Sequence, residues 1–146
     1  MTTVMVFGTF DLLHEGHKHL FREARAHGNR VVAIVARDAT VSDVKKHPTR
    51  YSEPERLAAV VGTGLVDFAR LGNHGDVYSV IEEEQPDVIC LGYDQTHFVD
   101  KLPAELAARG LSPLIVRASS HRPDELKSSL LKTAKHTYTA IPEKSV

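Results

Sequence analysis

Short apolar runs alternate along the chain with longer segments in which apolar residues recur every three or four positions. The apolar runs, which are typical of strands, lie at residues 4–7, 31–36, 65–71, 87–91 and 114–116. The segments with helical spacing lie at about 17–27, 52–62, 76–85 and 102–109, and a last helix is expected from about residue 128. Strands that alternate with helices predict an α/β domain built on a parallel sheet.

The connections between these elements predict the order of the strands. Residues 31–36 form an almost unbroken apolar run, which is typical of a strand covered by helices on both faces. Five parallel strands with right-handed crossovers favour a doubly wound, Rossmann-like sheet with the order 3-2-1-4-5. Ligands bind such sheets outside the carboxyl ends of the strands, where the winding reverses. We therefore expect the loops after residues 7 and 91 to meet at one crevice.

The turn between the first strand and the first helix carries the most suggestive chemistry. Residues 8–17 read Gly-Thr-Phe-Asp-Leu-Leu-His-Glu-Gly-His, with His14 and His17 three positions apart at the entrance of the helix. The first turn of a helix offers unpaired N–H groups and the positive end of the helix dipole. Gly16 would let a ligand approach the backbone closely. The pattern predicts an anion site whose imidazoles act on a phosphate; the plainer alternative is a connection with surface histidines.

This stretch resembles the HxGH signature of the cytidylyltransferase-like nucleotidyltransferases. The resemblance implies that an acceptor phosphate attacks the α-phosphate of a nucleoside triphosphate and that pyrophosphate leaves. His14 and His17 would then stabilise charge on the α-phosphate. The resemblance also implies that Gly8, Thr9 and Phe10 border the nucleotide and that Asp11 faces the acceptor.

Further residues match positions that contact phosphates in this family. They are Lys45 or Lys46 in the basic loop, Arg56 on the following helix, Arg117 after the fifth strand, and Ser128 with Ser129 before the last helix. The resemblance makes Lys46 a candidate catalytic residue and places Arg56 on the acceptor side. Without the resemblance, the two lysines would be interpreted as part of a solvated loop and Arg56 as a surface charge on a helix. Ser128 and Ser129 would be interpreted as an ordinary helix cap.

Two segments point to a subfamily. Residues 91–95, Leu-Gly-Tyr-Asp-Gln, and residues 35–38, Val-Ala-Arg-Asp, resemble the archaeal-type FAD synthases, which transfer AMP from ATP to FMN. Glycerol-3-phosphate cytidylyltransferases usually have a tryptophan at the first of these segments, and this chain contains none. The resemblance implies that Gly92, Asp94 and Gln95 border the nucleoside. The C-terminal cysteines of some FAD synthases are absent.

A flavin ring needs an apolar or aromatic surface. Side chains on loops near the predicted crevice that would supply it are Phe10, Leu12, Leu13, Tyr51 and Phe98. Mg²⁺ would accompany the triphosphate, with phosphates and water supplying most of its shell and no dedicated protein metal site. The other histidines, including His19 and His74, read as surface residues, and His121 stays unassigned.

Composition limits the remaining classes of function. The 146 residues suit one domain, which we expect at 1–136 with a tail at 137–146. A net charge of −1 disfavours a nucleic-acid or membrane surface, and no apolar run approaches the length of a membrane span. The single cysteine, Cys90, excludes an internal disulfide and suits a reducing cytoplasm.

The sequence thus predicts a cytoplasmic nucleotidyltransferase that converts ATP and FMN to FAD. The alternatives are an enzyme that uses CTP and glycerol 3-phosphate, and a nucleotide-binding regulatory module without turnover. The resemblance also allows a homodimer, since dimers are common in this family.

Overall fold

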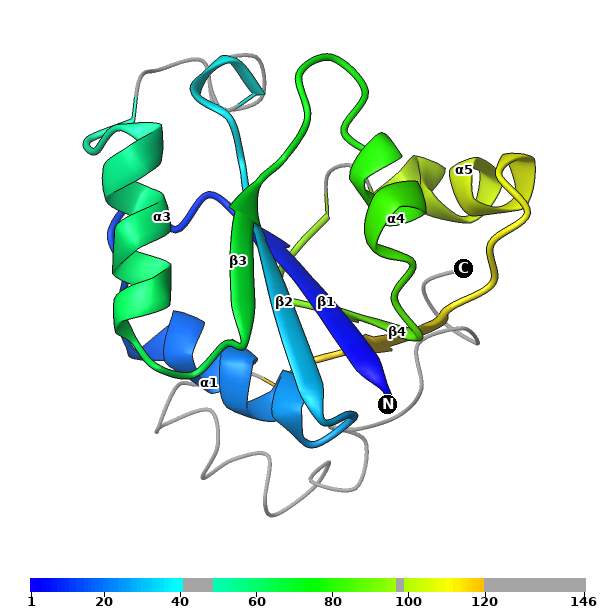
Figure 1. Cartoon of the computed structure of the whole chain (residues 1–146), viewed down its shortest axis with the longest axis horizontal. Coiled ribbons are helices and arrows are strands. Elements are labelled where there is room, and N and C mark those ends of the chain that lie inside the picture. The colour runs from blue at the N-terminus through cyan, green and yellow to red at the C-terminus, as the bar shows by residue number, and fades with distance from the viewer. Residues whose placement is uncertain (41–48, 97–98, 120–146) are drawn as a thin grey trace.

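The structure is a computed structural model that describes residues 1–40, 49–96 and 99–119. Within them, five strands form a single sheet in which every neighbouring pair is parallel. The order β3-β2-β1-β4-β5 confirms the predicted doubly wound sheet (Figure 1). The strands are β1 (Thr3–Gly8), β2 (Arg30–Val35), β3 (Phe68–Leu71), β4 (Val88–Leu91) and β5 (Leu114–Arg117).

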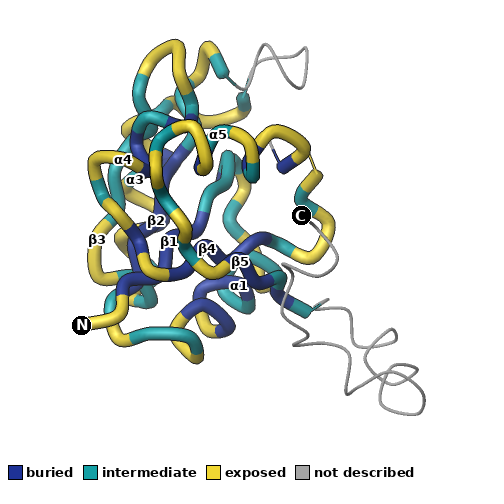
Figure 2. Tube along the Cα trace, turned by 90° about the vertical axis from the view of Figure 1, so that its right-hand side faces the viewer, coloured by how far each residue is buried: buried dark blue, intermediate teal, exposed yellow. Residues whose placement is uncertain are grey.

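Helices cover both faces of the sheet. One face carries α1 (Glu15–Arg25) and α3 (Glu53–Gly62), and the other carries α4 (Ser79–Glu84), α5 (Leu102–Ala108) and the short 3₁₀ helix η1 (Val99–Lys101) (Figure 1). Alternate residues of a strand point to opposite faces. Val4 and Val6 therefore pack with Phe21 in one core, whereas Met5 packs with Ile81 in the other. The centre of the sheet is buried on both sides (Figure 2).

Several element boundaries differ from the predicted ones. Helix α1 begins at Glu15, earlier than expected, because His14 caps it. Strand β3 begins only at Phe68; before it, Asp67 accepts a hydrogen bond from the Val31 N–H (2.8 Å). Helix α4 begins at Ser79 because Asp76 turns the chain by accepting from the Tyr78 N–H (2.9 Å).

The side of α3 that faces the core also differs in part. Val60 is buried as predicted, but Val61 is 56% exposed. The side chain that joins Val60 inside is that of Arg56. The predicted last helix and the boundary at residue 136 lie outside the described residues. In the part of the chain that the structure describes, no helix has the length and apolarity needed to cross a membrane.

Candidate active site

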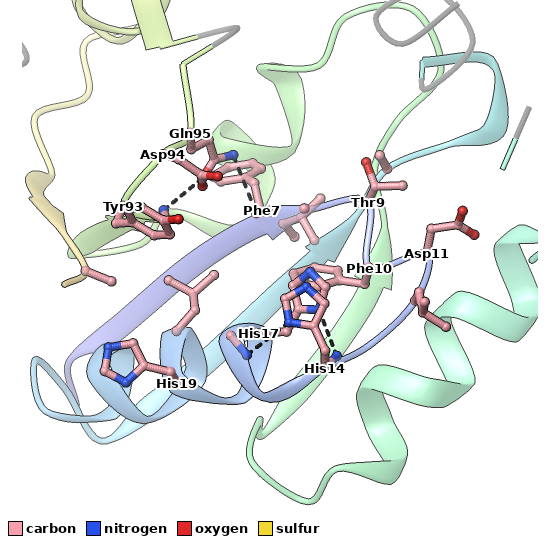
Figure 3. A pocket seen from close by; sticks show the side chains of 18 of the residues that line it. Phe7, Thr9, Phe10, Asp11, His14, His17, His19, Tyr93, Asp94 and Gln95 are labelled. Atoms are coloured by element: carbon pink, nitrogen blue, oxygen red, sulfur yellow. Dashed lines mark hydrogen bonds between the residues drawn. The ribbon is translucent and has the colours of Figure 1, made fainter. Parts of the chain in front are cut away.

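The carboxyl ends of the parallel strands open onto one large cleft. Its volume is about 1180 Å³, and its walls come from the loops after all five strands and from the first turns of α1. The predicted residues that line it are Gly8, Thr9, Phe10, Asp11, His14, His17, Gly92, Asp94 and Gln95. Tyr93, Asp94 and Gln95 lie across the cleft from His14 and His17 (Figure 3).

His14 and His17 cap the helix that carries them. Nδ1 of His14 accepts from the Gly16 N–H (3.0 Å), and Nδ1 of His17 accepts from the His14 N–H (3.2 Å). Their rings stack with centroids 3.9 Å apart. Because each Nδ1 accepts a hydrogen bond, each neutral ring carries its proton on Nε2. The pair therefore provides fixed N–H donors even when both rings are uncharged.

This capping changes the expected anion site. The Gly16 N–H is bonded to the His14 ring, and the amides of His17 and Lys18 donate to the His14 carbonyl (3.0 and 3.2 Å). In this arrangement these three amides already have partners, and the imidazole rings lie at the end of the helix where an anion was expected. A Cβ at Gly16 would lie 2.8 Å from Cε1 of His14. The absence of a side chain at Gly16 thus makes room for the ring to fold over the helix end. Gly16 also lines the cleft, and the close approach of a ligand to its backbone stays a prediction.

Phe10 forms the support beneath the histidines. Its side chain is only 2% exposed and its ring contacts those of His17 and Phe21, with centroids 5.3 and 5.4 Å away. A Cβ at Gly8 would lie 2.7 Å from this ring. Phe10 has a φ of 54°, in the left-handed region, which costs about 1–3 kcal/mol in a non-glycine residue. Close packing around the ring holds this strained turn under the imidazoles.

Arg56 is not a surface charge, so that alternative is wrong. Its side chain is fully buried and lies outside the residues that line the cleft. It donates to the carbonyls of Thr9 (2.8 Å), Ala36 (2.7 Å) and Tyr51 (3.2 Å), and to Asp38 (2.6 Å). The structure therefore places this predicted acceptor residue behind the wall of the cleft.

Asp11 lies in the wall and is held by the same region of the chain. Its two carboxylate oxygens accept from the N–H groups of Arg50 and Tyr51, both at 2.8 Å. Desolvation raises the pKa of Asp11, but these hydrogen bonds and the charges of Arg56 and Arg50 outweigh it and lower the pKa below its ordinary value. Asp11 is therefore a carboxylate at neutral pH, bonded to the start of α3.

Arg117 braces the loop on the other side of the cleft. Its Nη1 donates to the carbonyls of Gly92 (2.8 Å), Gln95 (2.8 Å) and Tyr93 (3.3 Å). The side chain of Gln95 closes the same loop by accepting from the Gly92 N–H (3.0 Å). Arg117 does not line the cleft, and its contact with a nucleotide stays a prediction.

Some predicted residues cannot be placed. Lys45, Lys46, Ser128, Ser129, Phe98 and His121 lie outside the described residues. Within residues 1–40, 49–96 and 99–119, no group of three or more His, Cys, Asp or Glu side chains is arranged to hold a metal ion.

His19 is a cleft residue that the sequence interpretation missed. It was expected at the surface, but it lines the cleft with Nε2 2.9 Å from Oγ of Ser119 and 3.3 Å from Oε1 of Glu23. Glu23 is only 7% exposed and also accepts from the Ser119 N–H (3.1 Å). The four-residue spacing of His19 and Glu23, which puts both on one helix face, was the available signal.

Other missed cleft residues lie near the carboxyl ends of β1 and β2, after β3 and before α4, and we call this set the second lobe of the cleft. They are Phe7, Ile34, Arg37, Gly72, Asn73 and Val77. Arg37 stays in place by donating from Nε to the Gly72 carbonyl (2.7 Å). Apart from the segment at residues 35–38, which contains Arg37, no sequence motif pointed to this set, because its residues come from four separate segments.

Known proteins match the chain along most of its length. The cytidylyltransferase-like family model matches residues 5–139. An FAD synthase of Methanosarcina barkeri is 44% identical to this chain, and the match covers 80% of this chain and 83% of that protein. An FAD synthase of Halomicrobium mukohataei is 39% identical, and the match covers 97% of this chain and 96% of that protein.

Solved structures agree with the fold. A lipopolysaccharide core biosynthesis protein of Thermoplasma volcanium has a TM-score of 0.78 and 37% identity, over 84% of this chain and 99% of its own. Pantothenate synthetase of Thermus thermophilus, at 16% identity and a TM-score of 0.55, covers 86% of this chain and 58% of its own and shares the fold alone. From the match over residues 5–139 and from these relatives, we conclude that the chain belongs to the cytidylyltransferase-like family.

Proposed function

We propose that the protein is an FMN adenylyltransferase, which transfers AMP from ATP to FMN and releases FAD and pyrophosphate. The observation that carries this proposal is the stacked His14–His17 pair at the start of α1, in a cleft wide enough for two substrates. The FAD synthases similar to this chain over most of its length support the choice of ATP and FMN.

The chemistry follows from the fixed imidazole donors. A phosphate oxygen of FMN attacks the α-phosphorus of ATP, a new P–O bond forms, and the bond to the pyrophosphate oxygen breaks. Charge increases on the α-phosphate oxygens and on the leaving group, so catalysis needs positioning and electrostatic stabilisation. The Nε2–H groups of His14 and His17 supply it at the α-phosphate. Lys46, Arg117, Ser128 and Ser129 are proposed to hold the β- and γ-phosphates, with Mg²⁺ entering on ATP.

The volume and the lining residues of the cleft suit two substrates. We expect the nucleoside to lie beside the loop of residues 92–95, with its α-phosphate at the histidine pair on the opposite side of the cleft. The second lobe offers apolar surface from Phe7, Ile34 and Val77 for a flavin ring. Among the apolar residues that the sequence suggested for this role, Phe10 and Leu12 line the cleft, whereas Leu13 packs against the core and Tyr51 lies outside the lining.

The two alternative functions account for less of this geometry. Glycerol 3-phosphate is small and polar, so it would leave the apolar lobe without a ligand. A regulatory module without turnover would not need the two histidines to be stacked and held with their Nδ1 atoms bonded. Both alternatives remain as outcomes of the experiment below.

The proposal is tested by product analysis. Purified protein is incubated with ATP, Mg²⁺ and FMN, and in parallel with CTP, Mg²⁺ and glycerol 3-phosphate. We expect FAD and pyrophosphate in equal amounts from the first mixture and no product from the second. CDP-glycerol from the second mixture without FAD from the first would contradict the proposal, as would the absence of pyrophosphate from both.

Loss of one imidazole should affect the chemical step. We expect His14→Ala and His17→Ala each to lower kcat by about 10²–10³-fold, the range for removing one preorganised donor. Because His14 also caps α1, His14→Ala should cost about 1 kcal/mol of stability. His14→Asn keeps a capping side chain, so it should retain stability yet lose turnover.

His74→Ala is the matched control, since His74 is exposed and lies outside the cleft lining. Steady-state kinetics and urea unfolding measure both effects. Wild-type kcat in His14→Asn and His17→Ala would remove the histidine pair from the mechanism.

A side chain added at Gly72 should obstruct the acceptor alone. A Cβ there would lie 3.5 Å from Cγ2 of Ile34, an ordinary contact, so Gly72→Ala should behave like the wild type. Gly72→Leu extends into the second lobe, where overpacking costs about 1–3 kcal/mol. We therefore expect the KM for FMN to rise by about 10–100-fold, with the KM for ATP unchanged. A rise in the KM for ATP instead would show that the two substrates occupy the opposite lobes.

A further inference from the structure

We propose that Arg56 is a positioning residue for nucleotidyl transfer and does not bind the acceptor. Its buried guanidinium joins the ends of β1 and β2 to the start of α3, and so fixes the wall of the cleft that carries Thr9 and Ala36. This inference rests on the proposed function in one respect: the effect of changing Arg56 is measured in the synthesis of FAD.

Every nitrogen of the Arg56 guanidinium donates at least one hydrogen bond. Nη1 donates to the Thr9 and Ala36 carbonyls, Nε donates to the Tyr51 carbonyl, and Nη2 donates to Asp38, at distances from 2.6 to 3.2 Å. Thr9 follows β1, Ala36 and Asp38 follow β2, and Tyr51 precedes α3. One side chain therefore connects three segments that are far apart in the sequence.

The position of these contacts relative to the cleft matters most. Thr9 and Ala36 line the cleft, whereas Arg56 lies behind them with a side chain that is 0% exposed. A phosphate could reach Arg56 only after the wall had opened and several of its hydrogen bonds had broken. A direct contact with the acceptor would thus destroy the arrangement that forms the site.

Asp11 completes the junction from the cleft side. It lines the cleft and accepts from the Arg50 and Tyr51 N–H groups, both at 2.8 Å. Tyr51 is therefore held twice, through its carbonyl by Arg56 and through its N–H by Asp11. The loop that leads to His14 is thus bonded to α3 through Arg56 and to the segment before α3 through Asp11.

Arginine suits this junction in a way that lysine does not. The planar guanidinium presents its donors in a rigid fork, whereas an ammonium is a single point with three donors. Lysine at position 56 would leave buried carbonyl oxygens without partners, which is unfavourable. We therefore expect Thr9 and Ala36 to shift in Arg56→Lys even though the charge is kept.

The experiment compares Arg56→Lys and Asp11→Asn with a matched control, Arg109→Lys. Like Arg56, Arg109 bonds several partners, which in its case are the carboxylates of Asp76, Glu82 and Glu105, but it lies outside the cleft lining. For each variant we measure the melting temperature, kcat and KM well below that temperature, and the Kd values of FMN and riboflavin by flavin fluorescence. Riboflavin lacks the phosphate, so the ratio of the two Kd values reports contact with that group.

A positioning role predicts a specific combination of results. Arg56→Lys should lower kcat at saturating substrates by about 10²-fold, the effect expected when reacting groups are misplaced by about 1 Å. Asp11→Asn should lower kcat in the same direction but less. The ratio of the Kd values for FMN and riboflavin should stay at its wild-type value in both. Arg109→Lys should lower the melting temperature and leave kcat unchanged.

Two results would overturn the inference. A loss of the preference for FMN over riboflavin, with kcat restored at high FMN, would make Arg56 an acceptor ligand. A lower melting temperature with wild-type kcat would make it a structural residue only.

Failure of the proposed function is separate, because it appears in the wild type as absence of FAD. In that case we replace the FAD assay. We measure instead the release of pyrophosphate from the nucleotide and acceptor that the wild type does use. If the wild type uses no nucleotide, we measure amide hydrogen exchange. Faster exchange at residues 8–11 and 49–52 in Arg56→Lys, but not in Arg109→Lys, would support the inference. Unchanged exchange in Arg56→Lys would overturn it.

Discussion

Backbone carbonyl groups at the carboxyl ends of the parallel strands must find partners where the chain turns into loops, and this requirement organises the site. Arginine meets it on both sides of the cleft. Arg56 pairs with carbonyls after β1 and β2 and before α3, and Arg117 pairs with those of the loop after β4. Rigid forks of donors suit such convergent acceptors. The loops therefore stay in place while the cleft between them remains open to substrates.

The geometry of the histidine pair suits both its capping of α1 and the catalytic role that we propose for it. By capping α1 through Nδ1, His14 and His17 satisfy helix amides that would otherwise be unpaired. The same bonds orient both rings and direct the Nε2 protons away from the helix backbone. Donors fixed in this way need no reorganisation when charge develops on a phosphate, which is the condition for effective electrostatic catalysis. The buried ring of Phe10 holds His17 from below.

Much of the fold was predictable because its signals are local. Apolar β-branched runs and helical periodicity identified all five described strands and the helices α1, α3, α4 and α5, and the crossover rule gave the strand order. The short helix η1 and the helical turn at residues 38–40 were not predicted. The meeting of His14 and His17 with Gly92 and Gln95 follows from that order, because both loops leave the sheet at its switch point.

The direction of individual side chains was not predictable in the same way. A motif places Arg56 and Arg117 on their elements, but their partners are carbonyls of other loops, whose positions depend on the assembled sheet. His19 was missed for the same reason, since its contact with Ser119 joins α1 to the end of β5. The roles of Lys46, Ser128 and Ser129 stay predictions.

In the proposed reaction, the α-phosphate of ATP reacts at the histidine pair and is transferred with its nucleoside to a flavin. The most direct measurement follows phosphorus label from ATP into the flavin product. With FMN and Mg²⁺, we expect label from the α-position of ATP to appear in the flavin and label from the γ-position to appear only in pyrophosphate. Label from the γ-position in the flavin, or no label in the flavin from either position, would contradict nucleotidyl transfer to FMN.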